Sequence, residues 1–259
     1  MKLLKKIFNR WRKPVNSYAA NFGAATNKDY KIRRQEIERF FTNRNKLDGE
    51  TTIESPSKNY SLTIEYYEMG ENNWNYSRGI VKEIKSGKII ADIKRNYSNF
   101  WHSWVVKDRN EYLICGEDYQ GQTVINLSER KISNYFPEAG EKGFGFCWAN
   151  VFPSPNSKIL AVEGCYWANP YDLVFFDFSH PDELPYRELK RIESIDEIRG
   201  WNKEGFFELT YEDEIRKSDG MRYKDLPEEE QDEMDNGNVE VSYRSVTLRI
   251  DSNEIKNDA

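Results

Sequence analysis

Apolar and polar residues alternate along most of the chain after about residue 51, with short turns between the alternating runs. This period-two pattern is typical of β-strands that bury one face, and turn residues such as Gly, Asn, Pro and Ser separate one strand from the next. The pattern predicts strands at 61–67, 80–84, 88–93, 104–106, 112–115, 123–126, 159–162, 172–178, 206–211 and 239–250. Hairpin turns are predicted at 85–88, 126–131 and 180–185.

The same unit recurs four times at intervals of roughly 50 residues. Each unit has a turn, an apolar strand, a loop rich in acidic or aromatic residues, and a second strand. An internal period of this length usually indicates one structural unit repeated, because each unit cannot bury its apolar face alone. The fourth unit is interrupted by an acidic insertion at about 212–238, which we interpret as a solvated loop or a short helix.

The first 50 residues have a helical pattern instead. Residues 1–13 form a short basic segment with one apolar face, and Pro14 ends that pattern. A capping sequence at 26–29 predicts a second helix that continues to about residue 45, with Ile37, Phe40 and Phe41 as its apolar face. We therefore divide the chain into a basic helical N-terminal extension, 1–50, and a β-repeat domain, 51–259.

The repeated unit resembles a blade of a WD40-like β-propeller. The resemblance rests on the turn Ser154-Pro155-Asn156-Ser157-Lys158, on the strand at 159–163 and on the later strand at 173–177, which ends in Asp177. It extends over about residues 51–250. It implies a mainly β fold of about four propeller-like antiparallel sheets after the helical extension. Four units are compatible with a small closed propeller, an open arc, or a dimer formed through sheet edges.

Charge divides the chain into a basic arm and an acidic body. The net charge is −6, yet residues 1–46 hold 13 basic and only 3 acidic residues. Only 38% of residues are hydrophobic, but 14% are aromatic, and aromatic side chains bury enough area to form a core. An acidic body favours a basic partner. The basic arm could dock on the acidic body of the same chain, on an anionic membrane or on a nucleic acid.

The three cysteines and the apolar runs indicate the compartment. Cys115, Cys147 and Cys165 are odd in number, lack metal-ligand spacing and lie in apolar or aromatic settings, which predicts reduced, buried thiols. The start of the chain lacks the uninterrupted apolar region of a secretory signal, and no run reaches the length of a spanning helix. We therefore expect a cytoplasmic protein.

The loop after the second strand of each unit is the strongest functional signal, because acidic and aromatic residues recur there. Such loops line one rim of a repeat protein, and large aromatic side chains with a polar atom anchor interfaces. We predict a non-enzymatic protein-interaction module, similar in principle to immunity proteins that neutralise a basic toxin. The predicted partner-binding residues are Trp74, Tyr76, Glu117, Asp118, Tyr119, Glu163, Tyr166 and Trp167.

Two other hypotheses remain open. Glu65, Glu117 and Glu163 end equivalent strands, and two carboxylates facing across a cleft would suit glycoside hydrolysis or a bound sugar. The competing interpretation is that a Glu just past a strand is a solvated surface residue. In the third hypothesis, the arm holds an anionic membrane or a nucleic acid through Lys5, Lys6, Arg10, Trp11 and Arg12.

The sequence indicates no metal site and no cofactor. The only histidines, His102 and His180, lack a third residue at ligand spacing, so we predict no metal, no cofactor and no catalytic residue. Trp104, Trp148 and Trp201 each lie shortly before the first clear turn of a unit, and we expect them to pack between adjacent units.

Overall fold

The computed structural model describes residues 27–70, 73–96, 99–141, 145–166, 170–193 and 195–255. Its strands form four antiparallel sheets, three with four strands and one with three, and each sheet follows chain order. The first sheet comprises β1 (Thr51–Glu54), β2 (Tyr60–Tyr67), β3 (Tyr76–Glu83) and β4 (Ile89–Arg95). The second comprises β5 (Ser103–Lys107), β6 (Asn110–Cys115), β7 (Gln122–Asn126) and β8 (Lys131–Tyr135).

The third sheet comprises β9 (Phe146–Pro153), β10 (Ile159–Tyr166), β11 (Asp172–Asp177) and β12 (Glu188–Ile192). The fourth comprises β13 (Ile195–Trp201), β14 (Phe206–Arg216) and β15 (Val241–Asp251). The helices are α2 (Asn27–Glu38), α3 (Glu138–Glu141), α4 (Glu228–Asp235) and α5 (Ser252–Ile255), with a 3-10 turn at Tyr223–Asp225.

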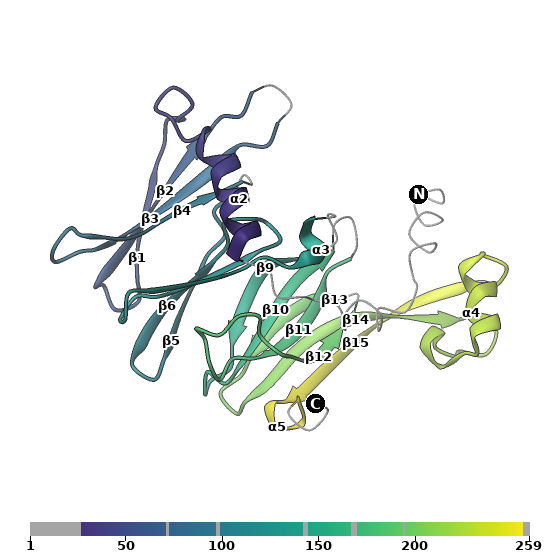
Figure 1. Cartoon of the computed structure of the whole chain (residues 1–259). Helices are drawn as coiled ribbons and strands as arrows, with labels where there is room; N and C mark the ends of the chain where they lie inside the picture. The colour runs from purple at the N-terminus through teal and green to yellow at the C-terminus, as the bar shows by residue number, and fades with distance from the viewer. Residues whose placement is uncertain are drawn as a thin grey trace.

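The sheets pack face to face in chain order, as propeller blades do (Figure 1). One core cluster joins the first and second sheets, another joins the second and third, and another joins the third and fourth. Among the described residues, no such cluster contains side chains from both the first and fourth sheets, which lie at opposite ends of the molecule in Figure 1. The predicted fold class is confirmed, and the four blades form an open arc.

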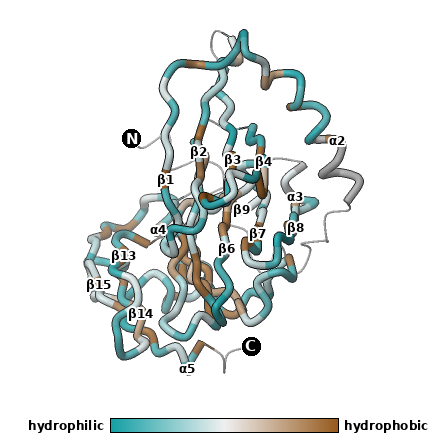
Figure 2. Tube along the Cα trace, turned by 90° about the vertical axis from the view of Figure 1, so that its left-hand side faces the viewer, coloured by the Kyte–Doolittle hydropathy of each residue, from teal (hydrophilic) through white to brown (hydrophobic). Residues whose placement is uncertain are grey.

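The two middle sheets are buried on both faces. Along β6, Leu113 and Cys115 belong to the first cluster, whereas Tyr112 and Ile114 belong to the second. Successive side chains of a strand point to opposite faces, so an uninterrupted apolar run serves two interfaces. The same division occurs along β10, where Ile159 and Ala161 face the fourth sheet while Leu160 and Val162 face the second. Figure 2 shows these hydrophobic runs along the strands and hydrophilic residues in many of the connections.

The two end sheets each bury one face. On β2, Leu62 and Ile64 pack in the first cluster, while the alternate residues on the same strand are polar. On β14, Phe207 and Leu209 pack in the third cluster, and Glu208 and Glu212 lie on the other face. Apolar and polar residues alternate along these segments, as expected for a sheet with one mainly solvated side, although Glu65 and Tyr67 on the outer face of β2 are also buried.

A tryptophan lies at each of the three interfaces. Trp104 packs against the first cluster, Trp148 against the second and Trp201 against the third. The Trp201 indole N–H also donates to the Phe152 carbonyl at 2.9 Å, which ties the fourth sheet to the third. The prediction that these residues pack between units is confirmed.

The recurring turn that opens three of the four units is built by one side-chain oxygen. Ser154 Oγ accepts from the backbone N–H of Ile159 at 3.0 Å, and Ser55 Oγ accepts from that of Tyr60 at 3.3 Å. In the fourth unit Asn202 Oδ1 accepts from the N–H of Phe206 at 3.0 Å. Ser, Asn and Asp favour such turns because their short side chains reach nearby backbone donors.

Sequence periodicity missed five strands, namely β1, β8, β9, β12 and β13. β1 and β8 are mostly exposed edge strands, and β13 contains two register irregularities. None of these three strands shows a clean alternation of apolar and polar residues. The predicted helix ends at Glu38 rather than near residue 45. There the chain turns so that Phe40 and Phe41 pack edge-on against Tyr76 and Tyr67 of the first sheet.

Candidate functional site

The four loops of the predicted site lie at one end of the sheets. In an antiparallel meander, every second connection lies at the same end, and these connections are 68–75, 116–121, 167–171 and 217–240. We call these four loops the rim. Helix α2 packs against β4 (Figure 1). Its Arg34 forms an ion pair with Glu117 of the second rim loop. The opposite end carries the turns that open each unit.

The carboxylates of the second rim loop are buried rather than displayed. Glu117 is 6% exposed and Asp118 is 3% exposed. Asp118 accepts from the Asn96 side-chain amide at 2.5 Å and from the Gln120 backbone N–H at 2.9 Å. Arg95 donates to the carbonyl oxygens of Gly116 at 2.8 Å and Asp118 at 3.0 Å. These bonds fix the conformation of the loop.

Glu117 forms an ion pair with Arg34 of α2. Burial raises the pKa of Glu117, and the hydrogen bond and charge of Arg34 act in the opposite direction. A second ion pair, Lys94 to Glu38, and the buried side chain of Ile37 also hold α2 on the first sheet. Glu117 therefore connects the N-terminal extension to the second sheet.

The predicted aromatic residues differ in exposure. Trp74 is 60% exposed in the first rim loop, whereas Tyr76 is partly buried at the start of β3 and stacks edge-on with Phe40, ring centroids 5.4 Å apart. Tyr119 is partly exposed. Tyr166 is also partly exposed, and the Arg191 guanidinium lies 5.5 Å from its ring centroid. Among the predicted aromatic residues that the structure describes, Trp74 is the most exposed.

Several predicted residues lie outside the described part of the chain. They are Trp167 in the third rim loop and, in the arm, Lys5, Lys6, Arg10, Trp11 and Arg12. The hypotheses that depend on them stay predictions.

The three glutamates of the glycosidase hypothesis are bound in separate places. Glu65 accepts from Lys46 at 2.6 Å and from the Tyr67 hydroxyl at 2.7 Å. Glu163 accepts from the Asn150 side chain at 2.6 Å, and Glu117 pairs with α2. Each carboxylate is thus engaged by a partner of its own, and the described contacts do not direct two of them to one cleft.

The acidic insertion is a folded element that extends the fourth sheet. Its core contains the buried side chains of Leu226 and Met234, and Arg216 forms ion pairs with Asp219 and Glu230. Helix α4 exposes four acidic side chains at a spacing that places them on one face, Glu228, Glu229, Asp232 and Glu233. The sequence interpretation did not include this face in the site, although the spacing of the acids was visible.

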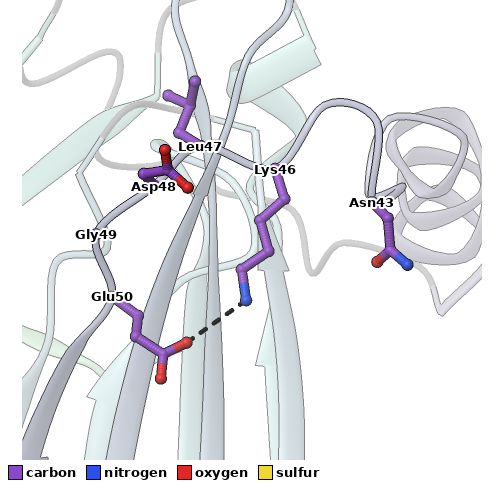
Figure 3. Close-up of a pocket in the computed structure, with 6 residues that line it drawn as sticks. All are labelled: Asn43, Lys46, Leu47, Asp48, Gly49 and Glu50. Atoms are coloured by element: carbon purple, nitrogen blue, oxygen red, sulfur yellow. Dashed lines mark hydrogen bonds and ion pairs between the residues drawn. The ribbon is translucent and has the colours of Figure 1, made fainter.

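A shallow hollow of about 420 Å³ lies beside the first sheet (Figure 3). It is lined by residues 43 and 46–50. Lys46 is engaged by Glu65 at 2.6 Å and by Glu50 at 3.4 Å, and these bonds, opposed by desolvation, raise the pKa of Lys46. Small-molecule sites are usually concave and mostly apolar, so this open, polar hollow does not favour one.

Two kinds of feature are absent from the described part of the chain. No group of three or more His, Cys, Asp or Glu side chains in that part of the chain is arranged to hold a metal ion. None of the described helices is long and apolar enough to cross a membrane.

Comparison with known proteins adds one clear relative. No protein-family model matches the chain. The protein of Acanthamoeba polyphaga mimivirus named "Uncharacterized protein R762" is 36% identical over 224 residues, which cover 83% of this chain and 88% of that protein. Among solved structures, the Cps50 (Swd1) β-propeller domain of Myceliophteria thermophila aligns with a TM-score of 0.39 and 14% identity. That alignment covers 62% of this chain and 49% of the propeller chain.

Proposed function

Because this chain belongs to the same family as mimivirus protein R762 and folds as four propeller-like blades, we propose that it is a non-enzymatic module that binds a basic protein partner through the rim. The observation that carries the proposal is the combination of exposed Trp74 in the first rim loop with a second rim loop whose backbone is fixed by buried polar bonds. A preorganised surface loses little conformational entropy when it binds.

The charges at the rim support a basic partner. The fourth rim loop, 217–240, holds 9 acidic and 3 basic residues, and the exposed face of α4 is acidic throughout. Complementary charge of this kind accelerates association and selects among partners more than it adds affinity. Trp74 supplies the large apolar contact that interface hot spots need, so the two features have different roles.

The buried carboxylates have a supporting role in this proposal. Asp118 orders the second rim loop, and Glu117 positions α2 beside it. Tyr119, Tyr166 and Glu163 are partly exposed and remain available as secondary contacts, and Tyr76 packs behind the first rim loop.

The proposal is tested by capture of a specific partner from native extract, followed by titration with the purified partner. We expect Trp74→Ala to weaken binding at least about tenfold, because a buried hot-spot aromatic contributes 2 kcal/mol or more. Ile89→Ala is the matched control, since Ile89 is 54% exposed but starts β4 at the opposite end. Equal weakening by both substitutions would indicate a general loss of folding.

Charge reversal tests the acidic face separately. Glu228→Lys, Glu229→Lys and Glu233→Lys together should slow association and reduce its salt dependence. The control reverses the same number of exposed acids at the opposite end, Glu129, Glu183 and Glu204, which should leave association almost unchanged. If neither Trp74→Ala nor the α4 variant alters binding, the rim is not the interface.

A further inference from the structure

Two cysteines of the third sheet lie directly opposite each other. Cys147 on β9 and Cys165 on β10 are partners in the antiparallel register, next to the pairs Trp148–Gly164 and Phe146–Tyr166. Opposed residues in an antiparallel pair have Cα atoms about 4.5–5.5 Å apart, and disulfides join cysteines whose Cα atoms are about 4.4–6.8 Å apart. The backbone register therefore holds both thiols within the reach of a disulfide.

The pair differs from the third cysteine in accessibility. Cys147 and Cys165 are partly exposed, and because they are opposed across two strands their side chains share one face of the sheet. Cys115, by contrast, is fully buried in the core between the first and second sheets. Cys147 and Cys165 are thus the more accessible cysteines of the chain, and Cys115 is the protected one.

Burial, and to a lesser degree nearby charges, make the two thiols slow to react. Burial, together with the nearby Cys165 and Asp118, raises the pKa of Cys147 to about 12. Burial also raises the pKa of Cys165, and Asp172 and Glu163 add to that effect. Thiolate is the attacking species, so exchange at neutral pH is slow, and proximity rather than activation favours the bond.

We propose that Cys147 and Cys165 are a modification site, where an intrachain disulfide forms by exchange with a small-molecule disulfide of the oxidised-glutathione type. One protein thiolate attacks a sulfur of the small disulfide and releases one glutathione thiolate. The second protein thiolate then attacks the protein sulfur of that mixed disulfide and releases the other. The protein loses two protons and two electrons, and the small disulfide is reduced to two thiols.

The bond would act at the base of the rim. Cys165 precedes the third rim loop, 167–171, by two residues, and Cys147 lies at the start of β9, just after the connection from the second sheet. A link here covalently joins β9 and β10 at the rim end of the third sheet. It is independent of whether the rim binds a basic partner.

The test uses the full chain, purified reduced and incubated overnight with oxidised glutathione at pH 8.5. The remaining thiols are then alkylated, and the chain is digested with trypsin for mass spectrometry. The three cysteines fall in different peptides, 110–130, 143–158 and 159–187. We expect peptides 143–158 and 159–187 to be joined by a disulfide that dithiothreitol cleaves, with peptide 110–130 fully alkylated.

Single variants provide the matched control. Cys147→Ser and Cys165→Ser should each stop at a mixed disulfide with glutathione on the remaining partner, since no second thiol can displace it. The wild-type peptide measurement requires no variant, so it stands even if a serine substitution destabilises the sheet. Any of four results would overturn the proposal. They are alkylation of all three cysteines, glutathione adducts without a protein disulfide, a disulfide to Cys115, and a disulfide between two chains.

Discussion

At the scale of single residues, similar glutamates have opposite electrostatic roles. Glu65 lies among Lys46, Tyr67 and Arg78, and although burial acts to raise its pKa, the hydrogen bonds from Lys46 and Tyr67 outweigh it and lower the pKa. Glu117 is paired with Arg34, and there burial dominates and raises the pKa. The sequence pattern predicts both at the ends of equivalent strands, but Glu65 lies within β2 and Glu117 lies in the loop after β6. The opposite pKa shifts therefore arise from their different tertiary partners.

These opposite shifts give stability profiles of opposite sign. In the unfolded chain Glu117 has a pKa of about 4.3 and loses its proton above that pH. In the folded chain the raised pKa lets Glu117 keep its proton to a higher pH. The contribution of Glu117 to the unfolding free energy therefore falls as pH rises above about 4. We therefore expect the stability of wild type relative to Glu117→Gln to decrease with rising pH. Urea denaturation of both proteins between pH 3 and 7 measures this difference.

Glu65→Gln is the control for that experiment. The lowered pKa of Glu65 contributes stability above the unfolded pKa of about 4.3, and the contribution is lost as pH falls through the folded value. Wild type relative to Glu65→Gln should therefore gain stability as pH rises from 3. Profiles of the same sign for both variants would contradict this account of the two carboxylates.

At the scale of elements, three of the four blades share a turn before their second strand that is closed by one side-chain oxygen. Ser154 is 2% exposed, and its hydroxyl accepts from the backbone N–H groups of Lys158 and Ile159 at 3.2 and 3.0 Å. The hydroxyl also donates toward Asn156 Oδ1 at 2.8 Å. This oxygen closes the turn, and the same position is Ser in the first blade and Asn in the fourth.

Ser154→Ala should lower the unfolding free energy by about 1–3 kcal/mol, because it removes the side-chain acceptor of the buried Ile159 backbone N–H. Ser245→Ala is the comparison, since Ser245 is exposed on β15 and its change should stay within about 0.5 kcal/mol. Chemical denaturation of both variants provides the measurement. An equal effect of the two substitutions would show that the turn contributes no special stability.

At the scale of the whole molecule, the arc has two inner blades and two end blades. The inner blades each bury two faces and the end blades one, and the described residues form three inter-blade clusters. Stability in repeat proteins is approximately a sum of unit and nearest-neighbour terms, so units with one neighbour open more readily.

Hydrogen exchange should therefore reveal a gradient along the chain. We expect the slowest amide exchange in β6, β7, β10 and β11, and faster exchange in β13, β14 and β15, where one face is solvated. Exchange followed by mass spectrometry of peptides resolves these segments. Protection as high in the fourth sheet as in the second would indicate that its outer face is covered, as in a closed ring or a dimer.

The sequence by itself determined the units, the hairpins and the tryptophans between units, because these depend on local periodicity and turn chemistry. The sequence also contained a pattern, not used in the sequence analysis, that distinguishes inner blades from end blades. The central strands have uninterrupted apolar runs at 112–115 and 159–162, whereas 61–65 and 206–210 mix apolar with polar residues. A run buried on both faces belongs to an inner blade, and an alternating run belongs to an end blade.

Only the tertiary structure decided which rim residues are accessible. Glu117 and Trp74 both occupy predicted rim loops, yet one is buried against α2 and the other is exposed. That outcome depends on Arg34, which is distant in sequence, and the register that opposes Cys147 and Cys165 likewise depends on a bulge beside Gly164. Burial and register arise from contacts between distant segments, so they are fixed only when the sheets pack.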